Sequence, residues 1–398
     1  MTMSSLPPDG DGFLEGVYQE VQPVLPTELK QSFKPWHKPR KHHIRVEMWC
    51  AAIGRLLRDN GLSEGDVLTY LGMPGEDFLD LRTLKNVCEP AKIKIRYLGI
   101  DSSAGLEEFE TNLSNHEISH LNYIYEHSYL MKGRIEDLAN TNSTVSRRAA
   151  SFRSFDIINI DLCDSIASVA KKPYFDALYQ LCLLQQSNRT KPWLLFLATR
   201  IGHTYVDADI KQKLVNCVLR NLDEHTTFDS LLRSTLSLGR EVISEYLDNK
   251  QLLPQTTLVQ LFVLAISKWL LRMMLSGNPE IIVSLMTSYS YRVYESQHPD
   301  MVSLGFLFEP HIKPPSDTGG IVKNPAKPPP PISESTLAEN IVKSVGSLVD
   351  VDVFLNDNPQ IFHLTTQEAA GLLATARYDP QSFLTWVNEI TWKPATDS

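Results

Sequence analysis

The chain has 398 residues, of which 42% are hydrophobic and 21% are charged, and its formal net charge at pH 7 is -9. This length exceeds what one compact core usually holds, so we expect one large domain with appended parts. The acidic balance argues against a general nucleic-acid binder, although a local basic patch remains compatible with it.

The cysteines and the N-terminus indicate the cellular compartment. Five scattered cysteines form no C-x-x-C pair, so we expect neither a disulfide framework nor a zinc site, and no bound metal. Residues 1–12 are small, polar and turn-rich, without the basic start and apolar core of a signal peptide. We therefore expect a cytoplasmic protein.

A basic segment at residues 33–45 reverses the acidic balance of the chain. It places five Lys or Arg residues, one tryptophan and three histidines within thirteen residues. One interpretation is a phosphate or nucleic-acid contact, in which the tryptophan stacks on a base. A second is that the cations neutralise a cofactor carboxylate or the acidic rim of its pocket, and a third is a solvated arm attached to the fold by its aromatic residues. The candidate contact residues are Lys34, Trp36, Lys38, Arg40 and Lys41.

Helical and strand patterns alternate from residue 45 to about residue 200. Residues 45–62 predict a helix that ends at Asn-Gly, and residues 67–72 predict a strand followed by a tight turn at 73–75. Residues 76–88 predict a helix that opens with acidic residues, as the helix dipole favours. A second strand follows at 93–101.

The alternation continues through three more strands. Residues 129–140 predict a short third strand and a helix start, and 155–165 predict a fourth strand. A helix at 173–186 precedes a fifth strand at 193–200. Five strands with helical crossovers indicate a doubly wound parallel α/β sheet.

The next region is mostly helical, from residue 207 to residue 275. Its apolar stretch at 258–275 approaches membrane length, but Gln260, Lys268 and Arg272 favour a buried helix, so no membrane contact is expected. Two β-rich runs, at 281–295 and 301–310, then predict an antiparallel hairpin. The helices are therefore expected to be an insertion before the last two strands of the same sheet.

A Pro-rich linker divides the rest of the chain. We expect an N-terminal arm at 1–44, a main domain at 45–310, the linker at 311–332 and a small C-terminal helical unit at 333–398. The helical unit is expected either to pack against the main domain or to bind a partner. Because linker and helices add surface without obvious chemistry, we expect a protein partner at the C-terminal helices.

Polar residues follow the strand ends, where ligands bind in parallel sheets. After the first strand, glycines give close backbone approach, and Asp101 after the second can accept from both hydroxyls of a ribose. Acidic residues after the third strand could accept a hydrogen bond from the exocyclic amine of adenine. Those after the fourth strand flank the place where the reactive end of a cofactor would lie. The candidates are Gly72, Pro74, Gly75, Asp101, Glu136, Asp137, Asp161 and Asp164.

Five features together point to one known family: the order of strands, the acid that ends the second strand, the G-x-x-E-D before the fourth, the D-x-x-D after it and the closing hairpin. In these features the chain resembles class I S-adenosylmethionine-dependent methyltransferases. The resemblance covers about residues 45–310. It implies that Gly72 and Gly75 line the methionine end of S-adenosylmethionine, Asp101 the ribose, Asp137 or Glu136 the adenine, and Asp161 the substrate side. By analogy it leaves open a bacterial accessory or phage-defence setting.

The chain departs from that family's pattern at two strand ends. The family usually has an acidic residue and a G-x-G-x-G turn after the first strand, where this chain reads Y-L-G-M-P-G. The fourth strand ends in I-D-L-C-D, without the D/N-P-P-Y/F of base amino-methyltransferases and without a Pro-Cys pair. The methyl acceptor is therefore unidentified, with nucleic acid and protein both open.

Each candidate also has a purely structural interpretation. Asp101 could cap a helix, Asp164 could do the same, and Glu136 and Asp137 could be first-turn acids that interact with a helix dipole. Cys163 is expected to be a small buried hydrophobe rather than a nucleophile.

His203, after the fifth strand, is a candidate base toward an acceptor, or merely a loop histidine. Two hypotheses follow. The first is a methyltransferase-like enzyme that uses S-adenosylmethionine, with the insertion and the C-terminal helices shaping the acceptor site. The second is a catalytically inactive Rossmann-like module that senses a nucleotide or serves as a scaffold in a multi-protein complex.

Overall fold

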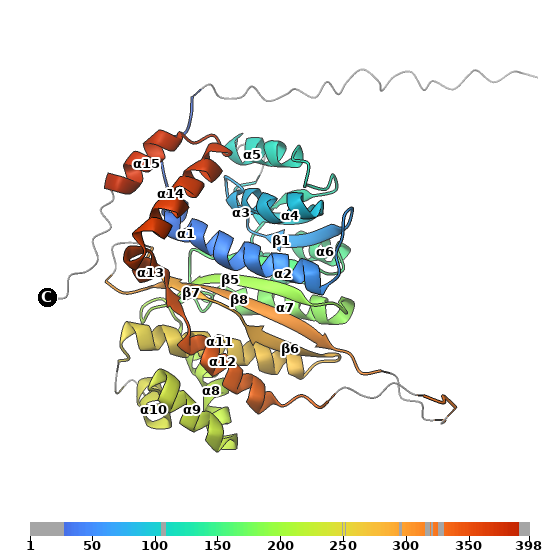
Figure 1. The fold of residues 1–398 in the computed structure, drawn as a ribbon. Helices are drawn as coiled ribbons and strands as arrows, with labels where there is room; N and C mark the ends of the chain where they lie inside the picture. The colour runs from blue at the N-terminus through green and yellow to red at the C-terminus, as the bar shows by residue number, and fades with distance from the viewer. Residues whose placement is uncertain are drawn as a thin grey trace, which may run out of the picture.

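The computed structural model describes residues 28–389 except for short gaps at 105–108, 249, 251, 294–296, 315–318, 320 and 325–329. Most of the expected N-terminal arm and parts of the Pro-rich linker therefore lie outside the described residues. The described chain forms a mixed α/β fold around one central sheet (Figure 1).

The first long helix starts earlier than the sequence predicted. A 3-10 turn at Pro35–His37 (η1) leads into a continuous helical run made of Pro39–Ile44 (α1), a π-helical stretch at Arg45–Cys50 (η2) and Ala51–Asp59 (α2). Proline at the first helical position is well tolerated because its missing N–H would have no intrahelical partner. The helix ends at Asn60, before a positive φ at Gly61, as predicted. Residues 39–45 of the basic segment are thus part of a packed helix.

The parallel part of the sheet has the predicted five strands. They are Val67–Gly72 (β1), Lys94–Asp101 (β2), Tyr129–Lys132 (β3), Ile157–Asp161 (β4) and Trp193–Arg200 (β5). Their spatial order is β3-β2-β1-β4-β5, and every neighbouring pair among them is parallel. The order reverses between β1 and β4, and such a reversal opens a crevice beyond the carboxyl ends of the strands.

Helices connect these strands. They are Leu79–Thr83 (α3), Lys85–Ala91 (α4), Phe109–Ser119 (α5), the 3-10 helix Ile135–Ala139 (η3), Thr144–Ser151 (α6) and Tyr174–Asn188 (α7). The prediction of a helix from residue 76 was wrong at its start. Gly75 and Phe78 both have positive φ, which no continuous right-handed helix contains, so Glu76 and Asp77 lie in a turn.

The antiparallel part follows the helical insertion, as predicted. The insertion comprises Ala208–Glu224 (α8), Thr226–Leu236 (α9), Arg240–Leu247 (α10) and Gln255–Leu275 (α11). Strand Met301–His311 (β8) pairs with β5 and also with Glu280–Leu285 (β6) and Tyr289–Tyr291 (β7), each time antiparallel. Helix α11 is long and apolar enough to cross a membrane, but 72% of its most apolar window is buried inside the protein, so it is a core helix.

The C-terminal residues pack on the body. They form Glu334–Gly346 (α12), Val349–Asp350 (β9), Val351–Asp357 (α13), Pro359–Ala374 (α14) and Pro380–Glu389 (α15). Strand β9 pairs with β7, and α12 contributes buried side chains to the same core cluster as α11 and the sheet. Figure 1 shows these helices running along one side of the molecule. Of the two arrangements open for this segment, the structure has the one packed against the body.

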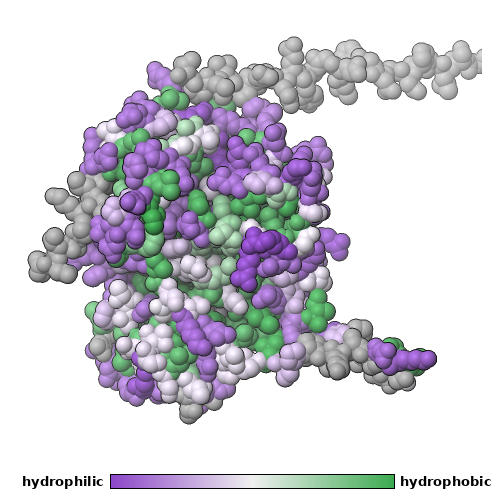
Figure 2. Space-filling model, viewed as in Figure 1, coloured by the Kyte–Doolittle hydropathy of each residue, from purple (hydrophilic) through white to green (hydrophobic). Residues whose placement is uncertain are grey.

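The surface of this side is mixed in polarity. On the face in Figure 2, hydrophilic residues gather over the upper helices and apolar residues show along its middle. Exposed apolar side chains on α13 and α14 include Val353, Ile361 and Leu364, the last with 59% of its surface exposed.

Candidate functional site

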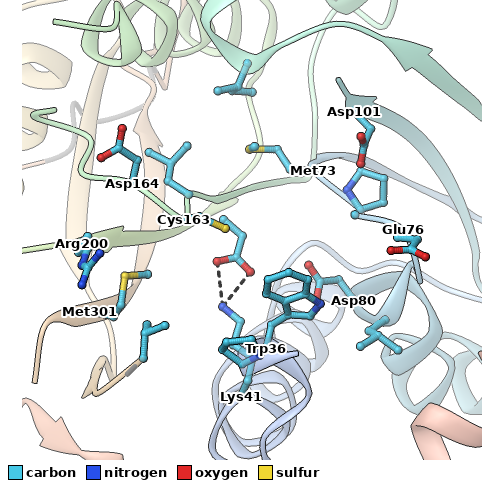
Figure 3. A pocket seen from close by; sticks show the side chains of 18 of the residues that line it. Trp36, Lys41, Met73, Glu76, Asp80, Asp101, Cys163, Asp164, Arg200 and Met301 are labelled. Atoms are coloured by element: carbon cyan, nitrogen blue, oxygen red, sulfur yellow. Dashed lines mark hydrogen bonds and ion pairs between the residues drawn. The ribbon is translucent and has the colours of Figure 1, made fainter. Parts of the chain in front are cut away.

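A cavity of about 670 Å³ lies at the carboxyl ends of the parallel strands (Figure 3). Its walls come from the turns after β1, β2, β3 and β4, from the ends of β5, β7 and β8, and from η1, α1 and the start of η2. This is the crevice that the reversal of strand order predicts.

The cavity brings together many of the predicted residues. Those that line it are Pro74, Gly75, Asp101, Glu136, Asp161, Asp164, Trp36, Arg40 and Lys41. Gly72, Asp137, His203, Lys34 and Lys38 are not among its lining residues.

Asp101 ends β2 and faces the cavity. Its Oδ1 accepts from the backbone N–H and the hydroxyl of Ser103, at 2.8 and 2.6 Å, in a local turn. The described residues 102–104 that follow it form a turn and no helix, so the helix-cap interpretation does not hold. Oδ2 has no partner among the residues that the structure describes. The turn therefore fixes the carboxylate while one oxygen stays available to a ligand.

Glu136 and Asp137 have different roles although they are adjacent. Asp137 Oδ2 accepts from the backbone N–H of Arg134 at 2.8 Å, which caps the start of η3. Glu136 lines the cavity instead. Of the two, the structural interpretation therefore applies to Asp137, and Glu136 remains the candidate for ligand contact.

Gly72 serves internal packing. A Cβ at this position would lie 2.5 Å from the ring of Tyr70, two residues earlier on the same face of β1. The Tyr70 ring thus covers the backbone that a cofactor was expected to approach. Gly75 differs, because its φ is +62° and a Cβ there would meet no described atom within 4 Å. The open backbone of the first turn is therefore at Gly75.

Replacing Gly72 with alanine is expected to lower the free energy of unfolding by about 1–3 kcal/mol, because the new methyl group overpacks against the Tyr70 ring. Gly54→Ala is the matched control, since its Cβ would make only ordinary contacts at 3.8 and 4.0 Å inside α2. That change should raise stability by about 0.5–1 kcal/mol through helix propensity. Urea unfolding of both variants measures the difference, and equal effects would contradict this explanation of Gly72.

Lys41, which is buried, and Asp161, which is partly exposed, form an ion pair in the cavity floor. The Lys41 Nζ lies 2.9 Å from Oδ1 and 2.8 Å from Oδ2 of Asp161, as the dashed lines in Figure 3 show. The ammonium also lies 5.2 Å from the ring centre of Trp49. Burial lowers the pKa of Lys41, but the Asp161 carboxylate, with Tyr291, outweighs it and holds that pKa above its ordinary value. The acid that ends β4 is therefore fully engaged by the basic segment.

A second buried pair lies beside the first. Arg45 Nε donates to Asp80 Oδ1 at 2.8 Å, and Arg45 also donates to the backbone carbonyl of Trp36. The amide of Asn159 donates to Asp80 Oδ2 and to the Tyr70 hydroxyl, at 3.1 and 3.0 Å. Burial and, to a smaller extent, the nearby Asp161 raise the pKa of Asp80, although Arg45 lowers it. The cavity floor thus rests on a polar network that links α3, β1 and β4 to the first helix.

These contacts correct the prediction of an exposed basic arm. Arg40 and Lys41 are buried and ion-paired, whereas Lys34 and Trp36 are exposed. Lys38 is partly buried and lies outside the cavity wall. Arg40, Lys41 and Arg45 are paired with Asp352, Asp161 and Asp80, so these three cations are directed into the fold rather than toward a nucleic-acid backbone. The arrangement corresponds to the interpretation in which the cations neutralise the acidic rim of a pocket.

Asp164 and Cys163 follow β4 at the cavity wall. Asp164 accepts from the Ser165 N–H at 2.7 Å and the Ser168 hydroxyl at 2.9 Å, and Lys172 lies 3.3 Å away. Cys163 is exposed in the cavity, so the prediction of a buried cysteine was wrong. Desolvation at the cavity wall and the neighbouring Asp161 raise the pKa of its thiol. The thiol is therefore protonated near neutral pH, which disfavours a nucleophilic role.

His203 lies away from this chemistry. Its Nε2 is 3.0 Å from the backbone carbonyl of Leu253, in the helical insertion, and its ring packs near Tyr246. It is thus the loop histidine of the two interpretations. Among the described residues, no three His, Cys, Asp or Glu side chains come close enough to hold a metal ion.

Several lining residues were not anticipated from the sequence. They are Arg45, Asp80, Lys172, Tyr174, Arg200, Tyr291, Arg292 and Met301. Lys41, Arg45 and Trp49 recur at four-residue spacing, in phase with the apolar Ile53 and Leu57 of the predicted helix. That continuity was the available signal that these two cations face inward.

Comparisons with known proteins give a family and a distant solved structure. No curated protein matches the chain. A Listeria monocytogenes crystal structure, provisionally assigned to the class I S-adenosylmethionine-dependent methyltransferases, aligns with 9% identity and a TM-score of 0.31. That alignment covers 70% of this chain and 64% of the other. The sequence matches the PP_RS20740-like family over residues 30–388, and the chain belongs to that family.

Proposed function

We propose that this protein binds S-adenosylmethionine in the cavity and acts as a methyltransferase-like enzyme. The observation that carries the proposal is the cavity at the β1–β4 reversal, with Asp101 and Glu136 on its wall and an antiparallel strand closing the sheet beside β5. Acidic side chains at these strand ends suit hydroxyl and amine donors of an adenosine.

The residues present fit this cofactor. Asp101 Oδ2 would accept from the ribose hydroxyls, and Glu136 would accept from the adenine amine. Pro74 and Gly75 would lie against the methionine part, where the open space at Gly75 permits close backbone approach. When bound, the cofactor supplies an electrophilic methyl group on a sulfonium, so the protein contributes orientation and exclusion of water more than reactive side chains.

A catalytically inactive nucleotide sensor or scaffold is the second candidate. Two observations favour it: the Tyr70 ring covers Gly72, and Lys41 engages both oxygens of Asp161. The Tyr70 ring leaves less room for a ligand beside β1. The ion pair with Lys41 makes the Asp161 carboxylate unavailable for direct contact with a methyl acceptor. Such a protein would bind a ligand in the same cavity without transferring a group.

Ligand-induced stabilisation tests the first candidate. S-adenosylmethionine or S-adenosylhomocysteine at about a hundred times its dissociation constant adds roughly 2.7 kcal/mol to the folded state, which is a readable rise in the unfolding temperature. Asp101→Asn should abolish most of that rise, because the amide keeps an oxygen for Ser103 but offers a donor where the ribose needs an acceptor. Asp101→Ala should have the same effect on the ligand shift.

Asp137→Ala is the matched control, since this neighbouring carboxylate caps η3 and lies outside the cavity wall. It should lower basal stability and keep the ligand shift. A wild-type protein that shows no shift with either compound would rule out the cofactor site and favour the scaffold.

The remaining expectations stay predictions. They are a nucleic-acid or protein acceptor, a protein partner at the C-terminal helices, a cytoplasmic location and a phage-defence setting. Deletion of residues 333–398 is a poor test of the partner, because it would remove α12 from the core. A charged residue in place of the exposed Leu364 would probe that surface and leave the core intact.

A further inference from the structure

The two ends of the cavity differ in charge. Figure 3 shows Asp101 and Glu76 at one end and Arg200, Met301 and Asp164 at the other. The adenosine assigned above would occupy the acidic end, where one exposed cation, Arg134, also lines the wall. The opposite end, formed by β5, β7 and β8, therefore needs an occupant of different chemistry.

Arg200 is held in place at this opposite end by a carboxylate behind the wall. Its Nε and Nη2 lie 3.1 and 2.9 Å from Asp300 Oδ2, and Asp300 is buried and outside the cavity lining. Asp300 Oδ1 in turn accepts from the backbone N–H of Val293 at 3.1 Å. The guanidinium is thus oriented from one side while it lines the cavity on the other.

The same arrangement recurs at a second carboxylate. Asp352, fully buried at the start of α13, contacts the Arg40 guanidinium at 2.9 and 3.1 Å. It also accepts from the backbone N–H and Nε of Arg292, at 2.7 and 3.3 Å. Both arginines line the cavity and Asp352 does not. Three guanidinium groups therefore border one end of the cavity, each positioned by an acid that the ligand does not reach.

Strand register places an apolar surface beside Arg200. Arg200 pairs with Met301 across β5 and β8, and Met301 pairs with Tyr291 across β8 and β7. All three line the cavity. Asp164, an acid that lines this end, already accepts hydrogen bonds from Ser165 and Ser168 and lies 3.3 Å from Lys172, so its charge is offset.

We propose that this end binds the anionic group of a second ligand, a carboxylate or phosphate attached to a flat apolar body. Guanidinium groups bind both anions through paired N–H donors in a fixed plane, and pre-orientation by buried carboxylates reduces the entropy cost of binding. Met301 and Tyr291 would contact the apolar body. The role of this ligand as methyl acceptor rests on the function proposed above, whereas the binding of its anionic group does not.

Paired small probes test the charge requirement. Benzoate and benzamide have nearly the same shape and differ in charge, and phenyl phosphate against phenol makes the same comparison for phosphate. We expect the wild-type protein, saturated with S-adenosylhomocysteine, to bind one anion of these pairs at least tenfold more tightly than its neutral partner in calorimetric titration. The preferred anion distinguishes a carboxylate ligand from a phosphate ligand.

Arg200→Gln should remove this preference, and Arg200→Lys should retain part of it because the charge stays and the planar fork is lost. Arg233→Gln is the matched control, since Arg233 is an arginine on α9 paired with Asp229 and Glu241 outside the cavity. An unchanged S-adenosylhomocysteine response in each variant shows that the fold is intact. If Arg200→Gln fails to fold, the lysine variant decides.

The outcomes separate the two proposals. Equal binding of charged and neutral probes, together with a normal S-adenosylhomocysteine response, overturns the anion site alone. Anion preference without any S-adenosylhomocysteine response overturns the cofactor proposal and leaves the anion site standing. A preference that survives Arg200→Gln also overturns the site.

Discussion

Replacing Arg45 with methionine is expected to lower the free energy of unfolding at pH 7 by about 3–5 kcal/mol. The change keeps most of the apolar volume but leaves Asp80 buried without its cation, next to the carboxylate of Asp161. The pKa of Asp80 is already raised by burial, so the unpaired carboxyl should take up a proton. The cost of the substitution should therefore decrease as the pH is lowered.

Urea unfolding at several pH values measures this effect, with two further variants for comparison. Arg45→Met combined with Asp80→Leu removes both charges and should recover much of the lost stability. Arg55→Met breaks the pair of Arg55 with Asp59 on α2, where the side chains are 62% and 47% exposed, and should cost less than about 0.5 kcal/mol. A loss for Arg45→Met as small as that for Arg55→Met would show that the network contributes little.

Acidification from pH 7 to pH 4 is expected to cost about 3 kcal/mol of stability through His42 alone. Burial of this imidazole in α1, with the positive charges of Arg45 and His43, lowers its pKa from 6.5 to about 4. The unfolded chain therefore takes up the proton from about pH 6.5 downward, and the folded protein does so only near pH 4. At 1.36 kcal/mol per pKa unit, the stability is complete above pH 6.5 and is lost through this window.

His42→Leu should remove this share of the pH dependence, because leucine takes up no proton. Glu368 on α14 lies 3.5 Å from His42 Nε2 but is about half exposed, so it does not compensate for burial. The exposed His363 on α14 provides a control, and His363→Leu should leave the pH profile unchanged. Parallel profiles for the wild type and His42→Leu between pH 7 and pH 4 would mean that His42 is protonated in the folded protein.

Both effects concern the packing of the first helix, and a third polar contact joins the segment before it to the C-terminal residues. Asp77, in the turn after β1, lies 2.9 Å from Lys30 and 3.1 Å from both His37 and the Tyr378 hydroxyl. Burial raises the pKa of Asp77, but His37 and Lys30 outweigh it and hold the pKa at about 2. The N-terminal segment that forms one wall of the cavity is thus attached to the turn after β1, which also contacts Tyr378 between α14 and α15.

The amino-acid sequence by itself determined the sheet and the place of the site. The alternation of short apolar runs and helical patterns is local, so β1 to β5, the helical insertion and β8 were predicted near their observed bounds, whereas the run at 281–295 was predicted as one strand and is divided into β6 and β7. Asp101 and Glu136 were also predicted at the cavity, since strand ends meet at one edge of a parallel sheet. A short-range pattern suffices for each of these features.

Only the tertiary structure decided what the polar residues do. Lys41 and Arg45 looked like parts of an exposed basic arm, yet their partners Asp161 and Asp80 lie 120 and 35 residues further along the chain. The sequence predicted that Gly72 lines a cofactor, but in the structure the ring of Tyr70 covers this glycine. Whether a charge is exposed, paired or open to a ligand depends on carboxylates and rings brought close by folding, because electrostatic energy varies with distance and burial rather than with position in the sequence.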